Sequence, residues 1–566
     1  MPRKRADTLS TSVASATTGN TQAGDAAGRK WLALAATCFG LFMALLDITI
    51  VNVALPTISK DLKASFEDLQ WVINAYTITL AVFLVTVGRL GDIFGRKRMF
   101  VTGLAIFTTG SLLCALSSGI SIGGLSHTTM LFVARAIQGF GGAFMLPLSL
   151  AIITATFEGH ERGTAIGVWG GVTGLGTAVG PVLGGVLVEK VSWQSIFFIN
   201  VPIGLIGIAL TLYAVTESRD ERAPRSIDFF GLLTSGAFVL CLVLALIQGN
   251  DRDKGWTSGY ILTLFAVSAI ALVAFVVGEL RMKNPMADPR LFKIPSFTGG
   301  AIVAFTLSAG FYSLLFFLAL YLQNTLGFDA LNAGVRFLAI SGMILIGAPL
   351  AGRLTDSIGP KPLLVVGSAG LVISVLLMAR ISSTSFAQDS WAVLLPAFIL
   401  GGLASGIMNP PISTLAVGTV ERRRAGMASG ISGLARQLGT AFGIAFLGAI
   451  LTSRYNSSIH DRVLGAQGPA WAHVPAMARQ GIVNGIQAAG TTAGSLGLPA
   501  SPQNPYSTSP LRPTLGEIAK SSFVGGTIDV FRIGAALVAV GLLASLFLVR
   551  RSDLKQSGHG QPPPAH

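Results

Sequence analysis

The sequence predicts an all-α integral membrane protein of fourteen transmembrane helices, arranged as two related six-helix halves with two further helices between them. Of its 566 residues, 51% are apolar and 12% are charged, whereas charged residues make up about a quarter of an ordinary soluble domain. Apolar runs long enough to cross a bilayer recur along the whole chain. The segment GRLGDIFGRK at 88–97 also returns as GRLTDSIGPK at 352–361, which indicates a duplication.

The spans are predicted from apolar runs of about 20 residues, the length that a helix needs to cross the hydrocarbon core. Each span must be helical, because an uninterrupted span has to satisfy its own backbone hydrogen bonds in lipid. The fourteen runs are 31–56, 69–88, 99–120, 129–153, 163–188, 195–216, 228–249, 257–280, 297–323, 331–352, 361–381, 391–416, 425–453 and 528–549.

Two more repeated strings define the halves. GAFMLP at 142–147 matches GIMNPP at 406–411, and GTAVG at 176–180 matches GTAFG at 439–443, so spans 1–6 correspond to spans 9–14. The predicted organisation is a disordered cytoplasmic tail at 1–30, a six-helix bundle at 31–216, a two-helix insertion with its linkers at 217–296, a second bundle at 297–550 that includes an extracellular loop at 454–527, and a tail at 551–566.

The basic residues predict the orientation. With a cytoplasmic N-terminus, the two tails and the even-numbered connections hold 25 Lys and Arg, and the odd-numbered connections hold 11, of which five lie in the long 454–527 loop. Basic residues favour the cytoplasmic side, so we expect a multi-pass cell-membrane protein with both termini in the cytoplasm. The net charge of +14 is explained by this orientation and by anionic lipid, and it does not indicate a nucleic-acid partner.

The pattern of the chain favours transport over catalysis. Repeated halves are typical of secondary transporters, in which two bundles rock about a central site. No phosphate-binding G-x-x-x-x-G-K-[ST] segment occurs, which argues against ATP hydrolysis. We therefore expect no enzyme activity and no cofactor, with an ion gradient as the energy source. A membrane receptor or scaffold on the same fold is the alternative.

Four motifs on successive spans make the resemblance specific. LDITIVNVALP at 46–56, GRLGDIFGRKRMF at 88–100, RAIQGFGGAF at 135–144 and GTAVGPVLGG at 176–185 together resemble the major facilitator superfamily, and within it the fourteen-span drug/proton antiporters. The resemblance implies a transporter that exports amphipathic organic compounds, such as drugs or antibiotics, in exchange for protons, and we expect it to be monomeric. A dedicated exporter of one metabolite, lipid or siderophore is the alternative, and sodium could replace the proton.

The motif after span 2 predicts a cytoplasmic latch. Its glycines allow a tight turn between two spans, and the resemblance implies that Asp92 and its basic neighbours form a charge network that holds the outward-facing state. Simple helix capping by Asp92 is the alternative. The second copy has Thr355 and Pro360 where the first has glycine and arginine, so its latch is expected to be weaker. The predicted latch residues are Gly88, Arg89, Asp92, Gly95, Arg96, Lys97, Arg353 and Asp356.

Span 5 is rich in glycine, which lets neighbouring helices approach closely, and its proline is expected to bend the helix. The segment GTAVGPVLGG at 176–185 resembles the antiporter motif of exporters. The matching stretch at 439–444 has no proline. The motif residues are Gly176, Gly180, Pro181, Gly184 and Gly185.

Energy coupling is predicted at Asp47, the acidic residue deep within a span. A carboxylate at that depth needs a polar partner or a cavity. Counting along spans 1 and 4 places Asp47 and Arg135 roughly 14 and 9 Å below the outer face, so the two could meet. We expect Arg135 to keep Asp47 ionised while they are paired, and Asp47 to take up a proton when the pair loosens. A static structural ion pair is the alternative.

The second half has deep arginines, Arg336 and Arg436, without a deep acid. They could bind an anionic group of a substrate or lock helix packing, and this inventory argues against a simple exporter of lipophilic cations. The resemblance places the substrate cavity among spans 1, 2, 4, 5, 9, 10, 12 and 13. The predicted cavity residues are Asn52, Gln138, Trp169, Tyr312, Gln323, Arg336, Asn409, Arg436 and Gln437.

Overall fold

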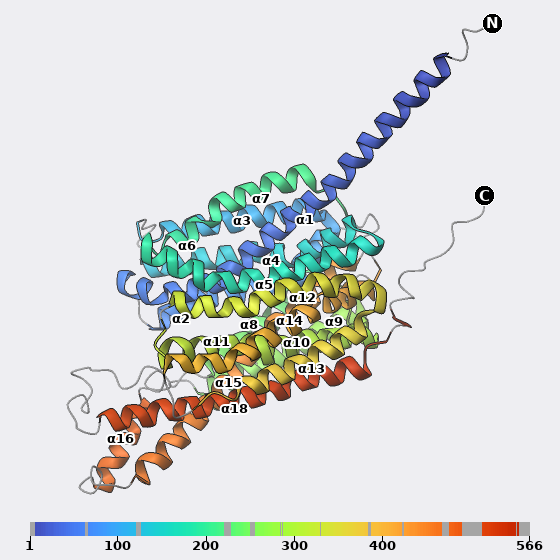
Figure 1. The fold of residues 1–566 in the computed structure, drawn as a ribbon. Coiled ribbons are helices and arrows are strands. Elements are labelled where there is room, and N and C mark those ends of the chain that lie inside the picture. The colour runs from blue at the N-terminus through green and yellow to red at the C-terminus, as the bar shows by residue number, and fades with distance from the viewer. Residues whose placement is uncertain are drawn as a thin grey trace.

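The computed structural model describes residues 6–62, 66–119, 126–219, 228–249, 255–282, 285, 287–328, 330–382, 387–421, 424–466, 475–488, 512–550 and 552–553. All regular elements within these ranges are helices, as the sequence predicts. The long helices run side by side, and α1 begins at the same end of the molecule at which α18 ends (Figure 1). We call this end the termini side and the opposite end the far side.

The first bundle follows predicted spans 1 to 6. Short connections join neighbouring helices, and Phe100, Phe107 and Tyr76 fill its centre. Its elements are α1 (Ala6–Leu62), α2 (Phe66–Phe94), α3 (Arg96–Leu116), α4 (His127–Thr156), α5 (Gly159–Lys190), α6 (Ser195–Phe198) and α7 (Asn200–Ala214). Span 6 is thus divided between α6 and α7.

The second bundle follows predicted spans 9 to 14. Span 9 is one path through α10, η2, α11 and η3, and the two η segments in it are π-helical turns. The elements are η1 (Pro289–Lys293), α10 (Pro295–Leu307), η2 (Ser308–Tyr312), α11 (Ser313–Leu320), η3 (Tyr321–Thr325), α12 (Ala330–Ile358), α13 (Pro360–Met378), η4 (Gln388–Leu394), α14 (Leu395–Gly418), α15 (Ala425–Leu464), α16 (Ala476–Ala488) and α18 (Arg512–Phe547).

The predicted insertion forms a hairpin of α8 (Phe229–Gln248) and α9 (Gly259–Arg281). Val239 and Val243 of α8 pack against Ile78 and Ala81 of α2, and Leu434 of α15 joins the same apolar cluster. Contacts with both bundles place α8 over the line where the bundles meet. α9 lies outside α8 and presents exposed apolar side chains, as expected for a helix that faces lipid.

Membrane-spanning capacity agrees with the predicted topology. Among the described residues, twelve helices are long and apolar enough to cross a membrane, and α2 is a thirteenth when its two parts, which are bent by 52°, are taken together. The remaining predicted span, α5, is a helix of 32 residues.

Three helices, α1, α15 and α18, extend further than the sequence predicts. α1 begins at Ala6, so the segment expected to be a disordered tail continues as a helix that projects from the termini side (Figure 1). This stretch contains several alanines and no proline, a composition compatible with a helix.

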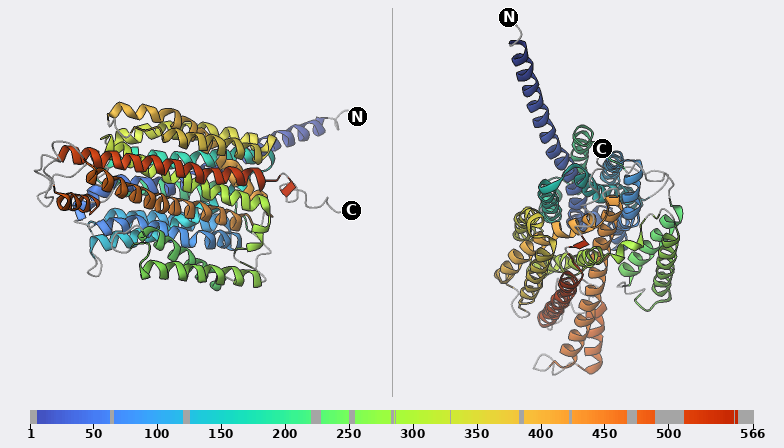
Figure 2. Two further views of the ribbon diagram at one scale, coloured as in Figure 1. Left: turned by 90° about the horizontal axis from the view of Figure 1, so that it is seen from below. Right: turned by 90° about the vertical axis from the view of Figure 1, so that its right-hand side faces the viewer.

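On the far side, α15 and α18 continue into the predicted 454–527 loop and form an arm with α16. Tyr455, Ile459 and Val463 recur at intervals of four residues on α15 and face a similar row on α18 that includes Leu515 and Phe523. These buried rows explain why a sequence too polar to be read as a span is helical. The arm extends beyond the two bundles (Figures 1 and 2).

Two pairs of helices make the most extensive contacts between the bundles. α5 packs against α12 from Gly163 beside Gly352 on the termini side to Gly185 beside Leu331 on the far side. α2 packs against α15, where the backbone of Gly88 lies against that of Gly426. Glycine allows this approach, because a Cβ at Gly88 would lie 2.5 Å from the Gly426 carbonyl oxygen.

Candidate functional site

An ion pair lies buried in the centre of the first bundle. Asp47 of α1 and Arg135 of α4 are 0% and 1% exposed, and Arg135 Nη1 donates to Asp47 Oδ2 at 2.5 Å. The sequence predicts this partnership from depth alone, and the structure brings the two side chains together.

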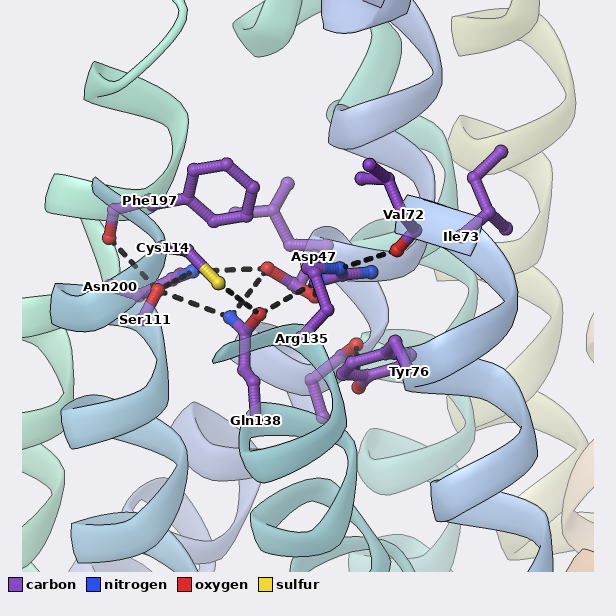
Figure 3. A network of polar contacts seen from close by, with 12 residues as sticks. Asp47, Val72, Ile73, Tyr76, Ser111, Cys114, Arg135, Gln138, Phe197 and Asn200 are labelled. Carbon is purple, nitrogen blue, oxygen red and sulfur yellow. Dashed lines mark hydrogen bonds and ion pairs between the residues drawn. The ribbon is translucent and has the colours of Figure 1, made fainter. Parts of the chain in front are cut away.

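Three more polar side chains, Gln138 of α4, Asn200 of α7 and Ser111 of α3, complete the network around the pair (Figure 3). Gln138 accepts from Arg135 Nη1 at 2.6 Å and donates through Nε2 to Asp47 Oδ1 at 2.7 Å. Asn200 Nδ2 donates to Asp47 Oδ1 at 3.4 Å and to Ser111 Oγ at 3.0 Å. The carboxylate therefore faces one cation and two amide donors in a water-poor setting, where such contacts are strengthened.

α2 holds the guanidinium from the other side. Arg135 Nε donates to the Val72 carbonyl oxygen at 3.0 Å, and Cζ lies 4.3 Å from the centre of the Tyr76 ring, a cation–π distance. The Tyr76 hydroxyl donates to the Ala44 carbonyl oxygen on α1 at 3.1 Å. A change in the Asp47–Arg135 distance would thus alter contacts of α1, α2 and α4 together.

Several members of this network were not predicted from the sequence, and one was predicted to lie elsewhere. Gln138 was predicted to line the substrate cavity, but it is 0% exposed and bonded to both ions. Ser111, Asn200 and Tyr76 were not predicted. Asn200 could have been noticed as an amide within the apolar span 6, although sequence position does not reveal that it faces Asp47.

A second polar cluster lies between the bundles. Arg436 of α15 donates through Nη1 to Asn409 Oδ1 on α14 at 2.7 Å and through Nη2 to Ser413 Oγ at 3.5 Å. Asn409 Nδ2 donates to the hydroxyl of Tyr312, in η2, at 2.9 Å. Trp169 of α5 lies with its ring centre 5.9 Å from Arg436 Cζ. The structure therefore brings together four of the predicted cavity residues.

The other predicted cavity residues lie apart from this cluster or are not described. Arg336 lies near the far-side start of α12, where its guanidinium is 3.6 Å from the ring centre of Phe328 and 4.8 Å from that of Trp391. Gln437 follows Arg436 in the sequence and is partly buried, and no contact joins it to the cluster within the described residues. The side chains of Asn52 and Gln323 lie outside the described part of the structure.

At the termini side, Asp92 joins the two bundles. Arg96 donates to Asp92 Oδ1 through Nε at 3.1 Å and Nη2 at 2.8 Å, and the backbone N–H of Met427 donates to Oδ2 at 3.2 Å. Met427 is in the first turn of α15, whose own cap residue, Arg424, supplies no side-chain hydrogen bond. Asp92 therefore caps a helix of the opposite bundle, where an anion is favoured.

The other residues of the motif around Asp92 form the turn into α3 and the start of that helix. Gly95 has a φ of 107°, as the turn requires, and Glu217 accepts from the backbone N–H groups of Lys97 at 3.0 Å and Arg98 at 3.1 Å. Arg89 is partly buried. Glu217, which the sequence analysis missed, thus caps the start of α3.

The second copy of the motif contacts the first bundle in a related way. Gly359 has a φ of 86°, and Asp356 lies against Gly163 near the start of α5, where an added Cβ would meet its carboxylate. Asp356 and Arg353 are exposed, whereas Asp92 is buried.

The glycines of span 5 pack α5 closely against α1. A Cβ at Gly176 would lie 3.0 Å from Leu45 Cβ, and one at Gly180 would overlap Thr49. Gly184 is buried and Gly185 faces α12. The side chain of Pro181 lies outside the described part.

Comparisons with known proteins agree with this architecture. Residues 37–444 match the model of the Major Facilitator Superfamily. The chain is 33% identical over 548 residues, 96% of each chain, to the tetracenomycin C resistance and export protein of Streptomyces glaucescens. It is 36% identical to the multidrug resistance protein Stp of Mycobacterium tuberculosis, over 76% of this chain and 78% of that one.

A solved structure supports the fold alone. A double-tryptophan mutant of XylE aligns with a TM-score of 0.59 at 13% identity, covering 94% of this chain and 99% of that one. The family match, the long alignments with exporters and the two-bundle helical fold agree. This chain therefore belongs to the major facilitator superfamily, as a transporter rather than an enzyme, and its relatives include proteins named for antibiotic export and for multidrug resistance.

Proposed function

We propose that this protein exports amphipathic organic compounds from the cytoplasm in exchange for protons, by alternating access in the cell membrane. The observation that carries the proposal is the buried Asp47–Arg135 pair, in which one carboxylate faces one cation within a single bundle. Burying a carboxylate at that depth costs free energy, and ionisable residues at such positions mark proton or substrate pathways. The named relatives, which export an antibiotic or confer multidrug resistance, support the substrate class.

The pair can couple proton uptake to bundle motion. While Arg135 and Gln138 contact Asp47, the carboxylate is stabilised as an anion. A rearrangement of α1, α2 and α4 that lengthens these contacts would leave a buried carboxylate without its counter-charge, and protonation would then neutralise it.

The latch would set which side is open. The Asp92 cap and the contact between Gly163 and Gly352 both join the bundles at the termini side. We place this side in the cytoplasm, as the basic residues predict, so these contacts would close the inward path and favour an outward-facing state.

Transport assays in proteoliposomes test the proposal. With an acidic lumen, wild-type protein should accumulate an external amphipathic dye, rhodamine 6G or fluorescein, while a trapped pH indicator reports faster loss of lumenal protons. Asp47→Asn should abolish the dye-dependent proton flux. Asp61→Asn is the matched control on α1. In the wild-type protein Trp193 Nε1 donates to Asp61 Oδ2 at 2.7 Å, and the amide oxygen of the variant can still accept this hydrogen bond.

Two results would contradict the coupling role. One is unchanged accumulation by Asp47→Asn under the pH gradient. The other is accumulation by wild-type protein driven equally well by a sodium gradient at constant pH, which would assign the coupling to sodium. Competition among unrelated dyes would separate a broad exporter from a dedicated one, because only a broad exporter would bind several of them.

A further inference from the structure

We infer that the cluster around Arg436, Asn409, Tyr312 and Trp169 binds an acidic group on an aromatic substrate, so that this exporter selects organic anions over organic cations. The inference rests on the proposed export function and adds the chemical class of the substrate. Its members come from α5 of the first bundle and from η2, α14 and α15 of the second.

The positive charge of Arg436 lies deep within the membrane-spanning part of α15. Arg436 is eleven residues into α15 from Ala425, which is about 17 Å along the helix and near the middle of a hydrocarbon core of about 30 Å. No ion pair joins Arg436 to an acid within the described residues. A guanidinium at this depth is costly, and an anionic ligand would offset that cost.

The repeat shows that this charge belongs to one half only. Gly439 aligns with Gly176, so Arg436 corresponds to Thr173 in the first bundle. A cation required only for the common helix packing would be expected in both halves. Its presence in one half favours a role that the first bundle does not share.

The Arg436 guanidinium has unused hydrogen-bonding capacity. A guanidinium has five N–H donors, and the described contacts of Arg436 use two of them, on Asn409 and Ser413. Asn409 in turn is fixed by the Tyr312 hydroxyl and by the Ser405 carbonyl oxygen. The guanidinium is therefore held in place while three donors have no protein acceptor in the described structure, which suits a carboxylate or phenolate.

Aromatic side chains lie beside the Arg436 charge. The Trp169 indole Nε1 donates to Ser149 Oγ at 2.9 Å, which fixes the ring near Arg436. Tyr312 ends the π-helical turn η2, a local feature often found at functional sites. A flat aromatic ring could stack on these side chains while its acidic group meets Arg436.

The same inventory disfavours a cationic substrate. The carboxylate at comparable depth, Asp47, already contacts Arg135, Gln138 and Asn200 and is 0% exposed. A cation in the central region would meet Arg436 rather than a free acid, which costs binding energy through like-charge repulsion.

The test compares two xanthene dyes of similar size in direct binding. Fluorescein at pH 8 has a carboxylate and a phenolate, whereas rhodamine 6G is a cation. Fluorescence anisotropy with purified full-length protein in detergent, without any gradient, should show tighter binding of fluorescein. Arg436→Gln should weaken fluorescein binding about tenfold or more and leave rhodamine 6G binding equal or stronger, while Arg436→Lys retains part of the fluorescein affinity.

A matched control and two contrary results make the test decisive. Arg462→Gln removes a positive charge from the same helix in the far-side arm and should leave both affinities unchanged. Equal weakening of both dyes by Arg436→Gln, at an unchanged unfolding temperature, would assign Arg436 to packing and overturn the inference. Tighter binding of rhodamine 6G than of fluorescein by wild-type protein, or no fluorescein binding, would overturn it as well.

This binding test is separable from the proposed function. Selective fluorescein binding without dye-dependent proton flux in proteoliposomes would contradict proton-coupled export and leave the binding site intact. Proton-coupled export with no effect of Arg436→Gln on dye selectivity would do the reverse.

Discussion

Removal of the Asp47 charge is the perturbation whose cost follows most directly from the structure. The Asp47→Asn variant keeps a side chain of the same shape, and Gln138 and Asn200 can still bond to its carbonyl oxygen. Arg135, at 1% exposed, would keep its bonds to Val72 and Gln138 but lose its counter-charge. The penalty is therefore that of an uncompensated buried cation.

The expected magnitude is large for a single substitution. Removing one partner of a buried ion pair costs about 3–5 kcal/mol, and the surviving amide contacts place Asp47→Asn near the lower end, at about 3 kcal/mol. Arg135→Gln should have a similar cost. The double variant removes both charges, so its cost should fall short of the sum of the single variants by about 2 kcal/mol.

Unfolding by SDS in mixed micelles, followed by the helical circular dichroism signal, measures these differences. The control cycle uses Lys30→Gln and Glu161→Gln, whose ion pair is 3.2 Å long but about half exposed, so its coupling should stay below about 1 kcal/mol. Additive costs for Asp47→Asn and Arg135→Gln would refute the reasoning, because they would show that the two charges do not depend on each other.

Three further changes test contacts elsewhere. Asp92→Asn should loosen the termini side, and a Val417→Cys probe in a cysteine-free background, buried between the bundles in wild type, should then react faster with a maleimide; an unchanged rate would contradict the cap. Gly167→Ala should reduce stability by about 1–3 kcal/mol, because the new Cβ would lie 2.8 Å from a carbonyl oxygen of α12, whereas Gly171→Ala, with its nearest atom at 3.6 Å, should be neutral. Glu217→Ala should cost about 1 kcal/mol in the SDS assay, since α3 loses the acceptor for two backbone N–H groups.

The membrane-embedded part of the fold could be predicted from the sequence, because each span is an apolar run with polar limits. The predicted run at 361–381 corresponds to α13, Pro360–Met378, and the run at 257–280 to α9. The arm could not be predicted in this way. In this stretch the buried row of Tyr455, Ile459 and Val463 takes only one position in four, and its burial depends on α18, which begins about fifty residues later.

The functional sites show the same limit. Depth arithmetic along spans 1 and 4 was enough to pair Asp47 with Arg135, because both helices cross the same bilayer. The depth count could not assign Gln138, because the direction of this side chain around α4 decides whether it contacts Asp47 or faces the other bundle. The Asp92 contact with Met427 was beyond sequence patterns, because a cap is ordinarily sought within a few residues and this one spans 335.

The continuity of α15 has a mechanical consequence. Its 40 residues form one helix, about 60 Å long, that begins at the Asp92 cap, passes Arg436 and ends in the arm. A rigid rod of this kind turns a small tilt at one end into a larger displacement at the other. Probes attached to the arm, on the far side, would therefore report a tilt of α15 that begins at the Asp92 cap on the termini side.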